Sequence, residues 1–124
     1  MMGRVEEKTR YSDHELEEFK QIIEGKLAKA QEQLTFYRNQ LKDLADSADA
    51  KSKGLDDGVG SAESERLTNM ASRQQNLIQH LENAQIRIKN KVYGICRQTG
   101  KLISKERLKA VPHATLSIEA KQNR

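Results

Sequence analysis

Residues that could carry out chemistry are few and widely spaced in this chain of 124 residues. It has one cysteine, Cys96, and three histidines, His14, His80 and His113, which are scattered along the sequence. It contains no glycine-rich phosphate loop followed by Lys and Ser or Thr, and no Ser, His and Asp set in the context of a nucleophilic site. Carboxylates are plentiful, but on helix faces they most often form local pairs with Lys or Arg. We therefore predict that the chain is not an enzyme.

The charge is divided unevenly along the chain. Residues 87–124 contain ten Lys or Arg and two Glu, whereas residues 1–86 contain 12 basic and 16 acidic side chains. A basic end and an acidic body favour two surfaces with different partners, although a solvated surface without a partner would have the same composition.

The composition excludes several classes of protein. Charged residues make up 32%, apolar residues 35% and aromatic residues only 4%, which argues against a large core, a β-sandwich or a barrel. No apolar run is long enough to span a membrane, and the first residues lack the apolar stretch of a signal peptide. A single cysteine cannot form an internal disulfide bond. We expect a cytoplasmic protein without a membrane partner.

Two long helices must position these residues. Ser12 and Glu15 have the spacing of a capping box, in which each side chain accepts the other residue's backbone N–H, and Tyr11 and Leu16 stand where a hydrophobic staple would pack. Apolar residues then recur at alternating spacings of four and three, which is typical of a coiled-coil seam. The first seam comprises Ile23, Leu27, Ala30, Leu34, Tyr37, Leu41, Leu44 and Ala48, and the second Leu67, Met70, Gln74, Leu77, Leu81, Ala84 and Ile88.

A break separates the two predicted helices. Residues 50–60 contain three glycines, so the chain is expected to fold back there and to form an antiparallel hairpin with its tip at about residues 50–61. Pairing of straight helices with a second copy stays open, but the position of the break favours a monomer. Residues 93–124 are turn-rich and too short for a core of their own, so we expect them to pack on the base of the hairpin. The predicted division is residues 1–92 and 93–124.

A set of residues near the C-terminus points to a known family. The set is Val92-Tyr93-Gly94-Ile95-Cys96, Gly100, Ile103, Arg107-Leu108, Ala110, Pro112, Ala114, Leu116, Ile118 and Lys121. It resembles the zinc-finger end of the DksA/TraR family, bacterial regulators that bind RNA polymerase. The hairpin and the length are similar to the longer members of that family. The resemblance implies an all-α fold, with a coiled-coil hairpin, a small degenerate zinc-finger module and a terminal helix.

In that family, zinc is held by two Cys-x-x-Cys pairs about twenty residues apart. The four matching positions here are Cys96, Thr99, Ser117 and Ala120. One thiolate, two hydroxyls and a methyl group do not make the tetrahedral thiolate set that structural zinc requires, and His113 would add only a second ligand. We expect a module without zinc or another cofactor, held by its apolar residues.

The family's hairpin tip carries an Asp-x-x-Asp-x-Ala motif and reaches through the secondary channel of RNA polymerase. The matching window is Lys53-Gly54-Leu55-Asp56-Asp57-Gly58, in which only Asp56 coincides with the motif. The resemblance assigns Asp56 and Asp57 to the channel tip. The alternative is that they are turn residues, because Asp and Gly favour loops.

The resemblance also implies basic contacts near the finger. Arg107, Lys109 and Lys121 are assigned to partner binding, and Lys121 matches a position that binds guanosine tetraphosphate with the polymerase. Val111 and His80 replace basic residues at two further positions, so we expect a weakened response to this alarmone of the stringent response.

The sequence leaves three functions open. The first is a zinc-independent modulator of transcription initiation that binds RNA polymerase, as the resemblance implies. The second is a nucleic-acid-binding module, but the basic end lacks interleaved aromatics, so its binding would be weak, salt-sensitive and not sequence-specific for DNA. The third is a structural coiled-coil adaptor. A Gre-type transcript-cleavage factor is less consistent with the C-terminal residues.

Overall fold

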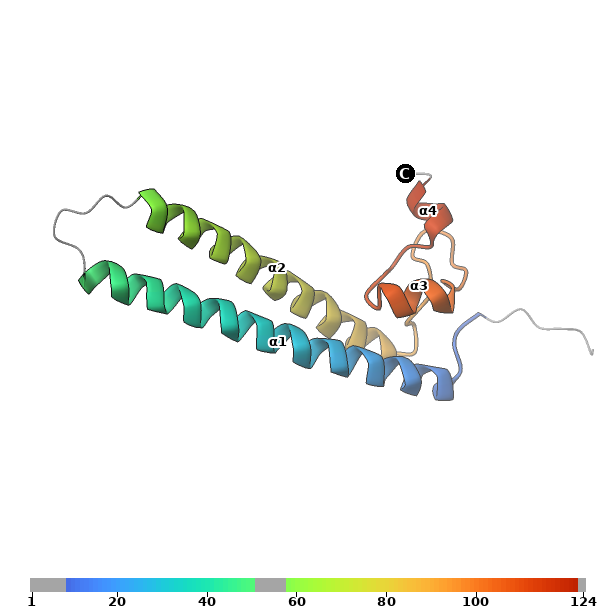
Figure 1. Cartoon of the computed structure of the whole chain (residues 1–124). Helices are drawn as coiled ribbons and strands as arrows, with labels where there is room; N and C mark the ends of the chain where they lie inside the picture. Colours follow the sequence, from blue (N-terminus) through green and yellow to red (C-terminus); the bar gives the residue numbers. More distant parts are fainter. Residues whose placement is uncertain (1–8, 51–57, 123–124) are drawn as a thin grey trace, which may run out of the picture. The chain divides into compact units, whose positions relative to one another are not determined.

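The computed structural model describes residues 9–50 and 58–122, with only the backbone for residues 48–50 and 58–61. Its helices are α1 (Asp13–Ala50), α2 (Gly58–Lys89), α3 (Lys105–Ala110) and α4 (Ile118–Gln122), and an isolated antiparallel bridge joins Ile95 to Leu102 (Figure 1). The predicted all-α fold with a terminal helix is confirmed. None of the described helices is both long enough and apolar enough to cross a membrane.

The start of α1 is fixed by the predicted capping box. The backbone N–H of Ser12 donates to Oε1 of Glu15 at 2.9 Å, and the N–H of Glu15 donates to Oγ of Ser12 at 3.1 Å. Tyr11 and Leu16, the predicted hydrophobic staple, are both buried. Because two of the N–H groups that lack helical partners are satisfied in this way, the first turn is held in register.

The described residues form two compact units. One contains residues 9–26 and 80–122, and the other contains residues 27–50 and 58–79. In each unit a segment of α1 lies alongside an antiparallel segment of α2, as the predicted intramolecular hairpin requires (Figure 1). The first unit includes chain on both sides of the division predicted after residue 92.

Burial follows the predicted seam. In the unit of residues 27–79, Leu34 and Leu67 are buried, whereas Phe36, which lies off the seam, is 53% exposed. Leu77 was expected to be buried but is only half-buried. A hairpin of two helices covers each seam side chain mainly from one direction, so part of the seam stays accessible to solvent.

The glycine-rich break is shorter than the sequence predicted. Helix α2 already begins at Gly58, inside the tip predicted at residues 50–61. Glycine is tolerated at a helix start, where the first N–H groups have no helical partners in any case. Asp56 and Asp57, the predicted tip residues, lie outside the described residues.

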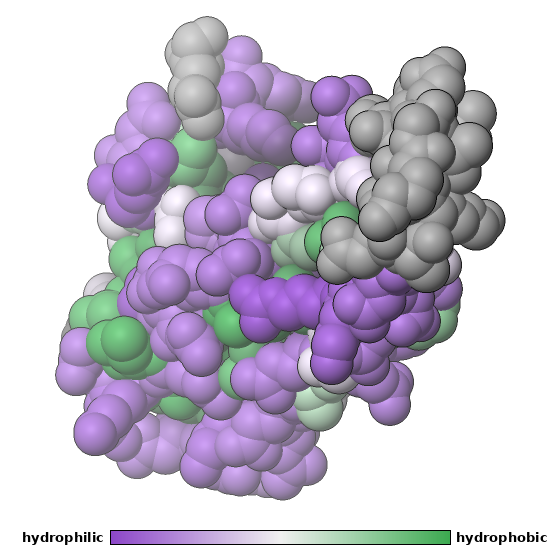
Figure 2. Space-filling view, turned by 90° about the vertical axis from the view of Figure 1, so that its left-hand side faces the viewer, coloured by the Kyte–Doolittle hydropathy of each residue, from purple (hydrophilic) through white to green (hydrophobic). Residues whose placement is uncertain are grey.

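The visible surface is largely polar. On the face drawn in Figure 2, hydrophilic residues predominate and apolar residues are confined to small separate areas. The large apolar side chains that are more than 45% exposed, Phe36, Ile86, Val92 and Ile118, are spread over the sequence. Single exposed apolar residues of this kind are normal and do not define a binding surface by themselves.

Candidate functional site

Three aromatic side chains join the C-terminal residues to the start of α1. Tyr93 is fully buried, and its ring lies 5.2 Å from that of Phe19, which in turn lies 5.4 Å from Tyr11. The hydroxyl of Tyr93 donates to the carbonyl of Pro112 at 2.7 Å, and the hydroxyl of Tyr11 donates to the carbonyl of Ile103. Both phenols therefore bury an apolar ring and satisfy a polar tip, which is the arrangement that favours burial of tyrosine.

Gly94 allows this close packing. Its φ is +80°, and a Cβ atom built on it would lie 2.6 Å from Cε2 of Tyr11. Such a distance is inside van der Waals contact, and the positive φ disfavours any other residue. The predicted docking of residues 93–122 on the base of the hairpin is confirmed by these contacts.

Ion pairs reinforce the same contact. Nζ of Lys105, in the first turn of α3, lies 2.7 Å from Oε2 of Glu15, and Nζ of Lys91 lies 2.6 Å from Oδ1 of Asp13. The hydrogen bond to Glu15 raises the pKa of Lys105, and the hydrogen bond from Lys91 lowers the pKa of Asp13. Glu15 thus caps its own helix with one oxygen and binds α3 with the other.

Two of the four positions that match the family's zinc ligands contact each other directly. Cys96 is fully buried, and the backbone N–H of Ser117 donates to its Sγ at 3.4 Å. The hydroxyl of Ser117 accepts the N–H of Ala120 at 3.1 Å and so caps α4, while the Ala120 side chain is buried. The Oγ1 of Thr99 accepts the N–H of Lys101 at 3.2 Å. Cys96, Thr99 and Ser117 thus each take part in a hydrogen bond within the protein, and Ala120 is buried.

The surroundings of Cys96 favour its thiolate. Burial alone would raise the pKa of this thiol. Hydrogen bonds from the Thr99 hydroxyl and from the backbone N–H groups of Ser117, Thr99 and Gln98 outweigh burial and lower the pKa to about 6. Hydrogen bonds to a charged form stabilise that form, so the donors supply part of the stabilisation that a bound cation would give.

The donor atoms do not fit a structural zinc ion. A closed tetrahedral site needs four nitrogen, sulfur or carboxylate ligands, and the four matching positions offer one sulfur, two hydroxyls and a methyl group. Among residues 9–50 and 58–122, no three His, Cys, Asp or Glu side chains converge as a metal site would require. His113, the substitute ligand considered from the sequence, is engaged elsewhere.

His113 instead stacks on His80 of α2. The two ring centroids are 5.1 Å apart and the rings are only 7° from parallel. Nδ1 of His113 is buried and has no hydrogen-bond partner among residues 9–50 and 58–122. A guanidinium N–H of Arg87 donates to the carbonyl of His113 at 3.3 Å. Burial, followed by the nearby His80 and Arg87, lowers the pKa of His113, so the ring is held neutral. This pair could not be predicted from spacing, because His80 lies on α2 and His113 lies 33 residues later, between α3 and α4.

Comparison with known proteins is consistent with this arrangement. Residues 91–123 match the model of the prokaryotic dksA/traR C4-type zinc finger. The RNA polymerase-binding transcription factor DksA of Caulobacter vibrioides is 32% identical over 117 residues, which cover 90% of this chain and 76% of that protein. The chain belongs to the DksA/TraR family.

Two further relatives of this DksA/TraR chain differ in how much they cover. General stress protein 16O of Bacillus subtilis is 28% identical over 105 residues, which make up 81% of this chain but only 64% of that protein. The structure of transcription factor DksA2 from Pseudomonas aeruginosa covers 87% of this chain and 81% of its own, with a TM-score of 0.74 and 23% identity. That similarity supports the fold.

The basic residues that the DksA/TraR resemblance assigned to partner binding differ in their surroundings. Arg107 is half-buried, and its Nε donates to the carbonyl of Leu116 at 2.8 Å, so this side chain holds the C-terminal segment onto α3. Lys109 and Lys121 are exposed. Their role in partner binding stays a prediction, and Lys109 and Lys121 are the better placed to meet a partner.

Proposed function

We propose that the chain is an RNA polymerase-binding transcription regulator of the DksA type that functions without structural zinc. The observation that carries the proposal is the 32% identity to the RNA polymerase-binding transcription factor DksA over 90% of this chain. Bacterial RNA polymerase is the proposed partner, and the protein acts as a cytoplasmic monomer. It has no catalytic role of its own.

In the proposed mechanism the hairpin enters the secondary channel of RNA polymerase. Helices of 38 and 32 residues carry the tip into the secondary channel, where Asp56 and Asp57 act on initiation. Acidic side chains there would interact with basic channel residues and with the metal-bound catalytic centre. Lys109 and Lys121 bind the polymerase outside the channel, and Arg107 supports the segment that carries Lys121.

Hydrogen bonds and aromatic packing take the place of zinc in this proposal. Cys96 is cradled by hydrogen-bond donors, Ser117 caps α4, and Tyr93 is buried between Phe19 and the carbonyl of Pro112. Such contacts hold together residues that a metal would otherwise join, and a module of about 30 residues needs such support.

The alarmone response should be weak. Val111 and His80 stand where the family has basic residues, and the His80 ring is stacked on His113. Loss of two charge-assisted contacts lowers the affinity for a ligand that carries several phosphate groups, because such contacts are about twice as strong as neutral hydrogen bonds. We therefore expect regulation by this protein to depend little on guanosine tetraphosphate.

The first test is binding to purified core RNA polymerase. Specific co-elution of the polymerase subunits supports the proposal. Binding to DNA fragments that is lost with added salt, without binding to polymerase, would favour the nucleic-acid-binding alternative instead. Binding to neither would leave the adaptor function and contradict the proposal.

The second test addresses the tip. The double variant Asp56→Asn, Asp57→Asn removes two charges and keeps side-chain shape and turn preference. A matched control, Asp43→Asn with Asp46→Asn, removes two exposed charges from α1. At concentrations that saturate polymerase, the tip variant should lose its effect on promoter-complex lifetime, and the control should keep it. Equal effects of both would mean that Asp56 and Asp57 are turn residues only.

A further inference from the structure

Glu15 is a buried charge with two partners. Of the charged residues in the part of the chain that the structure describes, it alone is buried, with 9% of its surface exposed. Its Oε1 accepts the backbone N–H of Ser12 at 2.9 Å, and its Oε2 lies 2.7 Å from Nζ of Lys105. A buried carboxylate is costly unless it is paired. Glu15 therefore joins the first turn of α1 to the first residue of α3.

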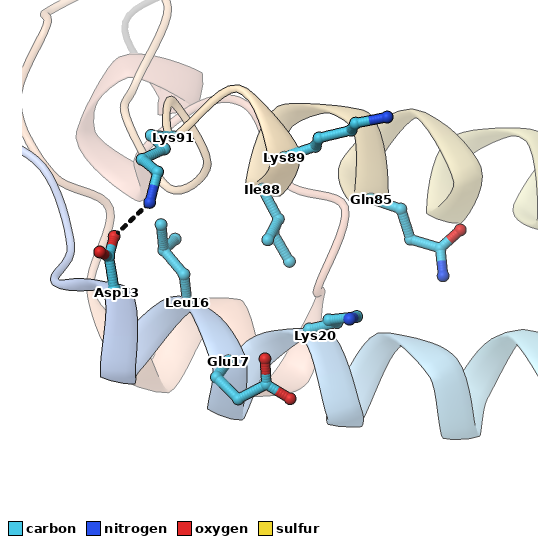
Figure 3. A pocket seen from close by; sticks show the side chains of 8 residues that line it. All are labelled: Asp13, Leu16, Glu17, Lys20, Gln85, Ile88, Lys89 and Lys91. Atoms are coloured by element: carbon cyan, nitrogen blue, oxygen red, sulfur yellow. Dashed lines mark hydrogen bonds and ion pairs between the residues drawn. The ribbon is translucent and has the colours of Figure 1, made fainter.

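The start of α1 is itself held in place. The ion pair between Nζ of Lys91 and Oδ1 of Asp13, which is 2.6 Å long, joins the first turn of α1 to the residues that follow α2 (Figure 3). The hydroxyl of Tyr11, just before α1, donates to the carbonyl of Ile103, two residues before α3. All of these residues belong to the same compact unit. The start of α1 is thus a fixed support for the start of α3.

Helix α3 is too short to be stable without such contacts. It has six residues, and helices much shorter than about 12 residues are not stable in water on their own. Ser104 caps it by accepting the N–H of Arg107 at 3.2 Å, and Leu108 is fully buried. Leu108 anchors the helix in the core, and the ion pair of Lys105 holds it one turn earlier. Together these two contacts define how α3 is turned about its axis.

The turn of α3 about its axis determines where Lys109 lies. Lys109 follows Lys105 by four residues, so the two share one face of the helix. Lys109 is exposed. We propose that Glu15 is a positioning residue: by binding Lys105 it fixes the face of α3 that presents Lys109 to RNA polymerase. This inference rests on the proposed function, in which Lys109 binds the polymerase outside the channel.

A double-mutant cycle on affinity for core RNA polymerase, with the full-length protein, tests this role. Glu15→Gln keeps the capping box, since Gln also serves at this position, and Lys105 stays solvated because 48% of its side chain is already exposed. Lys109→Gln removes the proposed contact with polymerase. Each single variant should bind about fivefold more weakly than the parent, and the double variant less than about twofold more weakly than either.

A matched control removes a charge from the same unit. Glu24 is exposed on α1, and Glu24→Gln should leave both the affinity and the effect of Lys109→Gln as in the parent. Amide chemical shifts give a readout without polymerase. Glu15→Gln should shift the resonances of residues 105–109, and Glu24→Gln should leave them in place. Circular dichroism verifies that each variant keeps its helices.

The outcomes separate this role from the proposed function. An ion pair that only stabilises the fold would lower the free energy of unfolding, but Lys109→Gln would then weaken binding equally with Glu15 and with Gln at that position. Such additive effects, or unchanged resonances of residues 105–109, would overturn the positioning role while polymerase binding stands. Failure of the parent protein to bind polymerase would contradict the proposed function itself, and this role with it.

Discussion

The backbone N–H of Ser117 donates to Sγ of Cys96 at 3.4 Å, so a hydrogen bond joins two positions that match metal ligands of the family. The Ser117 side chain also makes a hydrogen bond: its hydroxyl accepts the backbone N–H of Ala120 and caps α4. A cap of this kind stabilises a helix by about 1 kcal/mol. The backbone of the C-terminal module is thus compatible with only one cysteine among the four positions that match zinc ligands.

The titration of Cys96 tests this arrangement. Hydrogen bonds that outweigh burial lower the pKa of this thiol from 9.0 to about 6. The ultraviolet absorbance of the thiolate should therefore appear with a midpoint near pH 6, with Cys96→Ala as the blank. Because the folded-state pKa is lowered, this stabilisation is fully present above pH 9 and is lost as the pH falls through about 6. A midpoint near 9 would mean that the donors do not stabilise the thiolate.

Acid should loosen the contact between His113 and α2. Burial, His80 and Arg87 lower the pKa of His113 below 6.5, so the folded state favours the neutral ring. The corresponding stability is present above pH 6.5 and is lost as the pH falls below that value. The variant His113→Gln keeps a neutral polar side chain and should lose less stability than the parent between about pH 7 and 5.5 in urea unfolding. Equal losses in both proteins would contradict this role.

Two glycines with positive φ allow a matched comparison. Gly94 and Gly100 have φ of +80° and +76°, but only at Gly94 would a Cβ atom meet neighbouring atoms, at 2.6 Å from Tyr11. Gly100→Ala should cost about 1 kcal/mol of unfolding free energy through backbone strain. Gly94→Ala should cost at least about 1 kcal/mol more, because Tyr11 must also move. Urea unfolding measures both, and similar costs would mean that Tyr11 adapts freely.

The seam leucines should differ in their contribution to stability. Leu34 is buried and Leu77 is only half-buried. Leu34→Ala should lower the unfolding free energy by about 2–4 kcal/mol, and Leu77→Ala by about half as much, since it leaves less buried volume empty. Phe36→Ala, at an exposed site off the seam, serves as the control and should cost little. A melting temperature unchanged for Leu34→Ala would contradict the packing of the hairpin.

Local sequence signals predicted much of the fold. The spacing of Ser12 and Glu15 predicted the reciprocal capping contacts, because such a box depends only on residues within one turn. The alternation of four and three predicted which face of each long helix is buried. The predicted end of the glycine-rich break, at residue 61, lies beyond the observed start of α2 at Gly58. The first residue of a helix tolerates glycine, so the glycine there did not prevent helix formation.

Contacts between distant parts of the chain were not predictable in this way. Tyr11 and Ile103 are 92 residues apart, and His80 of α2 stacks on His113, which lies between α3 and α4. Such relationships depend on how elements pack, which a single sequence does not encode locally. The family resemblance identified the four positions that match zinc ligands. It did not predict the hydrogen bonds that the residues at these positions form.

A DksA-type regulator that binds RNA polymerase without structural zinc should bind it equally well before and after removal of metal. Affinity for core polymerase is measured for the protein as purified and after dialysis against excess chelator, with metal content determined on both samples. We predict less than stoichiometric zinc, unchanged helicity and equal affinities. One zinc per chain, with unfolding and loss of polymerase binding on chelation, would mean that the protein requires structural zinc.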